Sequence, residues 1–179
     1  LVAWAALGHE TAGHDILHAD TGLQAELAEM LRTNLAPLGQ GLADYWADRI
    51  DETASDVMGI LNLGPAAGIG LIAYFRGLGK AYGQPAQLGS IGYDDDPHPA
   101  DIVRGYLAAE VVALLSFAGH AAWAKVIAAE TDKDRGPIEL AGKAVTAAVA
   151  RKSARIVAKT LVKGKAKALE NHALGDIQG

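Results

Sequence analysis

Apolar positions recur along most of the chain with the three-to-four-residue spacing of amphipathic helices. Ala and Leu dominate, and the every-second-residue alternation of half-buried strands is missing. The pattern predicts helices at about residues 2–18, 22–33, 42–61, 66–78, 99–130 and 137–164. We therefore expect a single all-α domain that covers residues 1–179.

Capping and turn residues mark where several of these helices begin. Thr21 and Gln24 form a Thr-x-x-Gln capping box at the start of the second helix. Pro99 and Pro137 fall in the first turns of the last two helices, a position that favours proline. Residues 79–99 are the one long irregular stretch, and loops of this length are often functional.

Composition narrows the classes of function. Of the 179 residues, 50% are apolar and 21% are charged, as is typical of a folded globular domain. The formal net charge of −5 argues against a dedicated nucleic-acid-binding protein. Because cysteine is lacking, disulfides, thiolate zinc sites and a cysteine nucleophile are excluded, and any metal must bind to His, Asp or Glu.

Two segments are apolar enough to raise the question of membrane insertion. Residues 60–75 are shorter than the roughly 20 residues that a membrane span needs. Residues 106–129 are long enough, but they contain Glu110, His120 and Lys125. We predict that both segments are buried core helices and that the chain has no transmembrane segment.

The most informative stretch is Gly8-His9-Glu10-Thr11-Ala12-Gly13-His14. Zinc peptidases commonly carry His-Glu-x-x-His, with the histidines four residues apart on one helix face. His9 and His14 are five apart, and on a regular α-helix they would diverge by about 140°. They can bind one metal ion only if the helix contains a π-bulge, which aligns residues i and i+5 and often occurs at functional sites. Gly13 would ease that distortion.

A second acidic stretch, Asp51-Glu52-Thr53-Ala54-Ser55-Asp56, lies within the third predicted helix. Glu52 and Asp56 are four residues apart and therefore share a face. The third ligand of a two-histidine zinc site is commonly a Glu. We predict that His9, His14 and Glu52 bind the metal, and that Asp56 or Asp51 accepts the free N–H of a ligand histidine.

The two stretches together resemble the dipeptidyl-peptidase III family of zinc peptidases. That family is marked by His-Glu-x-x-Gly-His followed by Glu-Glu-x-Arg-Ala-Glu/Asp, and residues 9–14 match the first motif at every fixed position. The second motif matches at Glu52 and Asp56, whereas Asp51, Ala54 and Ser55 depart from it. The resemblance covers about a dozen residues. It implies a zincin-like fold, zinc as cofactor, a peptide substrate and Glu10 as catalytic base.

The expected chemistry is metal-assisted hydrolysis. Zinc with three protein ligands keeps a position for water and lowers the pKa of that water to about 7. Glu10 can take the proton of the water and pass it to the leaving amine. Tyr93, His98 and His120 are candidate hydrogen-bond donors to the transition state. The sequence does not rank them.

Other interpretations of the same residues stay open. Glu10, His14 and His18 follow each other at four-residue steps and could bind a metal with Glu52 and Asp56 on a regular helix. The acidic run at 94–96 could bind a hard cation, although a solvated loop is favoured; alternatively, His98 and Arg104 line the cleft. A non-catalytic helical module of a larger assembly is the alternative function.

The start of the chain bears on substrate recognition. Residues 1–7 are already apolar, and we interpret the chain as beginning inside a larger protein or after processing. Zincins normally place a β-sheet before the motif helix, and the sequence predicts none. We therefore expect a partner chain or a preceding region to help recognise the substrate.

A basic stripe at four-residue steps runs along the last predicted helix and just past its end, and is made of Arg151, Arg155, Lys159, Lys163 and Lys167. Successive members differ by about 40°, so they form one slowly winding face. A solvated face is the favoured interpretation. Docking onto an acidic partner or an anionic membrane surface is the alternative.

Overall fold

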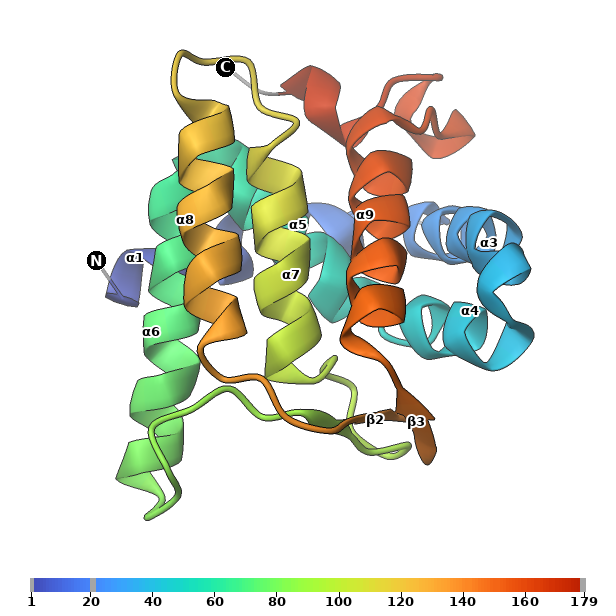
Figure 1. The fold of residues 1–179 in the computed structure, drawn as a ribbon. Coiled ribbons are helices and arrows are strands. Elements are labelled where there is room, and N and C mark those ends of the chain that lie inside the picture. The colour runs from blue at the N-terminus through green and yellow to red at the C-terminus, as the bar shows by residue number, and fades with distance from the viewer. Residues whose placement is uncertain (1, 20–21, 178–179) are drawn as a thin grey trace.

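A computed structural model describes residues 2–19 and 22–177. Most of them are helical, as expected, and the elements are arranged around a central helix (Figure 1). Thr21 of the predicted capping box lies outside the described residues. The α-helices are α1 (Val2–His9), α2 (Asp15–Ala19), α3 (Leu23–Leu35), α4 (Gln40–Ala47), α5 (Ile50–Leu63), α6 (Pro65–Ala81), α7 (Asp101–Val112), α8 (His120–Asp132) and α9 (Ala147–Lys163).

Helix α7 is the centre of the core. Nearly all of its side chains are buried, and it packs against α5, α6, α8 and α9. Figure 1 shows α7 between α8 and α9, with α5 behind it. Helix α3 packs against α4 and α9 on the other side of the molecule. None of the helices in the described part of the chain is long and apolar enough to cross a bilayer.

Three of the predicted helices are wrong in extent: two are interrupted, and the third begins later than expected. The helix expected at 42–61 is divided into α4 and α5 at Arg49. The backbone N–H of Arg49 donates to Trp46 O, and its guanidinium donates to the backbone carbonyl oxygen of Tyr45. The helix expected at 99–130 is divided into α7 and α8, and Gly119 adopts a left-handed conformation (φ 93°) before α8. The apolar sequence continues across this second break, so periodicity could not reveal it.

The helix expected from Pro137 begins instead at Ala147, because residues 138–145 form a hairpin. Strands β2 (Ile138–Leu140) and β3 (Lys143–Val145) are antiparallel, and β1 (Ile91–Gly92) pairs in parallel with β2. Ala141 and Gly142 both have positive φ, as the two-residue turns of hairpins require. The strands are too short for their alternation to stand out in the sequence.

The sheet and a tyrosine hold the irregular loop 82–100 against the helices. Ala100 N donates to Tyr45 Oη over 2.8 Å. The tyrosine ring lies so close to Gly92 that a Cβ there would be 2.8 Å from Tyr45 Cζ. Arg49 donates to the carbonyl oxygens of Tyr93 and Asp94. The loop is therefore fixed on both sides of its acidic run.

Segment 2–19 lies across α5 with the two backbones in contact. A Cβ on Gly59 would be 3.3 Å from His9 N, and a Cβ on Gly13 would be 2.5 Å from Ser55 Cβ. Side chains larger than hydrogen would force the two helices apart at these crossings. The glycines thus set the distance between residues 9–14 and residues 51–56.

The first part of the basic stripe is paired within the molecule. Arg151 binds Asp132 and lies over the ring of Tyr106, and Arg155 binds both oxygens of Glu110 at 3.0 Å. These pairs favour the interpretation of the stripe as a solvated, partly paired face. They connect α9 to α7 and α8.

We predict that Gly13→Ala destabilises the protein by roughly 1–3 kcal/mol, the scale of overpacking a tight contact. Gly77→Ala is the matched control, because Gly77 lies within α6 and, apart from its chain neighbours and its own helix backbone, no atom of residues 2–19 or 22–177 lies within 4 Å of a Cβ built there. Alanine there should stabilise the helix by about 0.5–1 kcal/mol. Urea unfolding of both variants measures the difference. Equal stability of Gly13→Ala and the parent would show that the helix crossing tolerates a methyl group.

Candidate metal centre

A π-helical turn (Glu10–His14) joins α1 to α2 and brings the two motif histidines together. Asp15 N donates to Glu10 O, the five-residue bond that defines a π-helix. As a result, His9 Nε2 and His14 Nε2 are 3.1 Å apart, although five residues separate them. The structure therefore has the bulge that the five-residue spacing required.

Helix α5 places Glu52 opposite this pair. Glu52 Oε2 is 3.1 Å from His9 Nε2, and Glu52 Oε1 is 3.4 Å from His14 Nε2. Four ligands around one ion at 2.0–2.1 Å are separated from each other by about 3.3 Å. The three groups are thus spaced like ligands of one tetrahedral ion. Oε2 is buried, and within the described part of the chain it makes no hydrogen bond of normal geometry.

The outer nitrogens of the two rings are held by carboxylates. His9 Nδ1 is 2.9 Å from Asp56 Oδ1, and His14 Nδ1 is 3.0 Å from Asp51 Oδ1. A neutral imidazole that donates from Nδ1 has its lone pair on Nε2. Both Nε2 atoms then face Glu52 as acceptors, and three acceptors around one point attract a cation.

Asp56 is fixed in turn by a buried arginine of α7. Arg104 donates to its two oxygens from Nε (2.7 Å) and Nη2 (2.8 Å), and the guanidinium lies over the ring of Phe75. Burial alone would raise the pKa of Asp56, but the charge of Arg104 and the hydrogen bond from His9 outweigh it and hold the pKa at about 2. Asp56 is therefore a permanent anion behind His9.

The same charges act on the inner groups. Burial opposes protonation of His9, but the carboxylates of Asp56 and Glu52 outweigh it and raise the pKa of His9 to about 9. Burial would raise the pKa of Glu52, yet His9 and the charges of His98 and Arg104 lower it. The electrostatic field therefore favours positive charge between the rings and Glu52, which a proton or a divalent ion can supply.

The centre opens onto a cavity of about 410 Å³. Glu10 is exposed at its edge, with a carboxylate oxygen within 4.8 Å of ring nitrogens of His9 and His14. It is near enough to act on a molecule beside the metal position. The cavity is lined by Ala6, His9, Glu10, Glu52, Leu71, Tyr74, Phe75, Leu78, Asp96, His98, Asp101 and Arg104.

Of the three candidate transition-state donors, His98 lies at the centre. Its Nε2 is 3.5 Å from Glu52 Oε2, and its Nδ1 is held by Asp96 Oδ1 at 2.8 Å. Among the described residues that line the cavity, neither Tyr93 nor His120 is found. The Tyr93 side chain is exposed, and His120 bonds to Ala113 O beyond the far end of α7. His98 and Arg104 line the cleft together, as one interpretation of the loop had expected.

Sequence reasoning missed the cavity wall on α6 and the roles of Asp96 and Asp101. Asp96 Oδ1 accepts the backbone N–H of His98 as well as its ring nitrogen, and Asp101 accepts Gly89 N. The spacing Asp-Pro-His is a signal for such a turn. No signal links α6 to the centre, since its residues are ordinary apolar ones.

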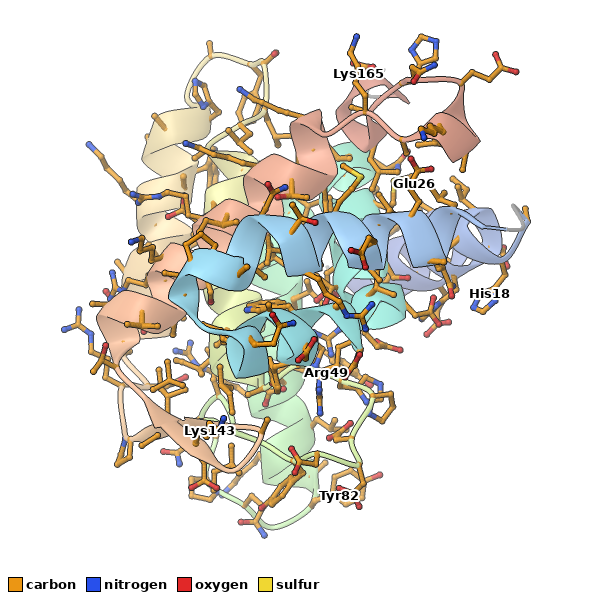
Figure 2. All side chains as sticks on the ribbon, turned by 90° about the vertical axis from the view of Figure 1, so that its right-hand side faces the viewer. His18, Glu26, Arg49, Tyr82, Lys143 and Lys165 are labelled. Atoms are coloured by element: carbon orange, nitrogen blue, oxygen red, sulfur yellow. The ribbon has the colours of Figure 1, made fainter. Side chains whose placement is uncertain are left out.

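The alternative stripe of Glu10, His14 and His18 is only partly assembled. His18 Nε2 is 3.2 Å from Asp51 Oδ2, and His14, His18 and Asp51 lie close enough to share an ion. Figure 2 shows His18 projecting at the edge of the molecule. Asp56 is not available to this group, because its oxygens already form hydrogen bonds with Arg104 and His9.

Comparison of the chain with protein-family models, with curated proteins and with solved structures gave no match.

We predict different outcomes for the two aspartates behind the rings. Asp51→Ala should weaken zinc affinity about 10–100-fold by freeing the His14 ring, with little effect on folding. Asp56→Ala also leaves Arg104 buried without its partner, which costs roughly 3–5 kcal/mol. Competitive zinc titration and urea unfolding measure the two effects. Unchanged zinc affinity in Asp51→Ala would rule out its role in orienting His14.

Proposed function

We propose that this protein is a zinc-dependent hydrolase that cleaves peptide bonds. The observation that carries the proposal is the convergence of His9 Nε2, His14 Nε2 and Glu52 at mutual separations of 3.1–3.4 Å. Both rings are oriented by carboxylates on their outer nitrogens. His9, His14 and Glu52 would hold the ion.

The donor set favours zinc over harder cations. Calcium and magnesium prefer oxygen ligands alone, whereas two imidazoles and one carboxylate suit zinc. Three protein ligands leave one coordination position for water or substrate, as catalytic zinc sites do. The cavity beside Glu10 gives a substrate access to that position.

The surrounding residues fit hydrolysis. A bound zinc ion supplies a Lewis acid that makes water more acidic and polarises a carbonyl group. The Glu10 carboxylate accepts the proton of the attacking water and returns it to the leaving nitrogen. His98, whose Nδ1 is held by Asp96, would in its protonated form donate a hydrogen bond from Nε2 to the developing oxyanion.

Peptides are the proposed substrates for two reasons. The His-Glu-x-x-Gly-His and Glu-x-x-x-Asp arrangement resembles that of the dipeptidyl-peptidase III family. The cavity also combines a wall of apolar side chains with several polar groups, which suits an amide flanked by side chains.

Metal analysis of the purified protein is the first test. We expect about one zinc ion per chain, lost in Glu52→Gln and in His14→Ala. His18→Ala is the matched control and should keep the ion, because His18 is not part of the proposed ligand set. Loss of zinc in His18→Ala together with its retention in Glu52→Gln would favour the His14–His18–Asp51 group instead.

Glu10→Gln separates catalysis from metal binding. The change keeps the size of the side chain but removes the base, so zinc content and folding should be retained while chelator-sensitive peptide hydrolysis falls about 10²-fold or more. Glu29→Gln, an exposed change of the same kind on α3, controls for the lost charge. Full activity in Glu10→Gln would place the base elsewhere. A parent that holds zinc and cleaves no member of a peptide library would make the centre a structural one.

A further inference from the structure

One face of α6 forms an apolar wall beside the metal centre. Its members follow the helical spacing of one face and are Leu71, Tyr74, Phe75 and Leu78. Tyr74 and Leu78 are each 39% exposed, so the wall is open toward the cavity rather than covered by other helices. The guanidinium of Arg104 lies over the ring of Phe75. Because the same arginine fixes Asp56, the wall and the metal centre are held in one relative position.

The polar side of the cavity carries an excess of negative charge. Four carboxylates line it, those of Glu10, Glu52, Asp96 and Asp101, and a bound zinc ion would offset only two of their negative charges. Asp56 largely neutralises the charge of Arg104, from which it accepts two hydrogen bonds. An acidic substrate side chain would therefore be repelled. An apolar side chain carries no charge and can pack against α6.

A second hollow of about 350 Å³ continues away from the metal centre past Phe75, Leu78 and Asp101. These three residues line both hollows, so the two are adjacent. The second one reaches Tyr82, which is 77% exposed beyond the end of α6 (Figure 2). Two adjacent hollows fit an extended chain better than a single free amino acid.

We infer that the α6 wall is a specificity site that takes a large apolar side chain, aromatic or branched aliphatic, next to the scissile bond of an extended peptide. The inference rests on the proposed function, because the wall becomes a subsite only if the reacting bond lies at His9, His14 and Glu52. Burial of such a side chain should favour it over alanine about 10–100-fold. Aspartate at the same position should be the poorest choice.

Zinc-chelating hydroxamates test this without requiring turnover. One series, N-acetyl-Phe, -Leu, -Ala and -Asp hydroxamates, places the side chain on one side of the chelating group. A second series, benzyl- and methyl-substituted succinyl hydroxamates, places it on the other. Calorimetric titration of the zinc-loaded protein should give a 10–100-fold preference for the large apolar member in at least one series.

Leu78→Glu places a charge in the wall at a half-exposed position and should abolish that preference while zinc content is kept. Val126→Glu is the matched control, since Val126 is also exposed on a helix but does not line the cavity. Equal affinity for all members of both series, or an unchanged preference in Leu78→Glu, would overturn the specificity site and leave the zinc centre standing. A parent that binds no zinc would overturn the proposed function itself, and the subsite with it.

Discussion

The contact between segment 2–19 and α5 is the constraint on which the site depends. Gly13 and Gly59 let the two backbones touch, and this close approach places the histidines of one helix opposite the carboxylates of the other. A π-helical turn alone aligns His9 with His14 and keeps Glu10 near them, but it does not bring a carboxylate between the two Nε2 atoms and the core. The crossing adds Glu52 and, one turn later on the same face, Asp56.

The buried pair of Asp56 and Arg104 extends this arrangement into the core. It connects His9 on α1 to α5, and α5 to the central helix α7, through charge-assisted hydrogen bonds. Buried ion pairs are poor evidence for stability, because desolvation offsets much of their attraction. Here the pair has a geometric effect: it orients the His9 ring and supports Phe75 in the cavity wall.

Local spacing carried most of what could be predicted about the centre. The five-residue interval between His9 and His14 required a π-bulge, and the four-residue interval between Glu52 and Asp56 placed both on one face. Contacts between distant segments could not be derived in the same way. His98 lies at the centre because Tyr45 and Arg49, some fifty residues earlier in the chain, hold its loop in place. None of these three residues belongs to a motif with a recognisable spacing. The hairpin at 138–145 was missed because three-residue strands leave little alternation to detect.

The π-helical turn can also be considered as an extra residue in an otherwise ordinary helix. Without Gly13 the motif would read His-Glu-x-x-His, and the two rings would align on a regular α-helix. An inserted residue rotates everything that follows it by about 100° around the helix axis, which would turn a long amphipathic helix away from its core. In this chain the helix ends at Ala19, only five residues after the turn. Within the five described residues of α2 the change of register therefore reaches one buried side chain, that of Leu17. A short downstream helix is what allows a residue to be added inside such a motif without rebuilding the fold.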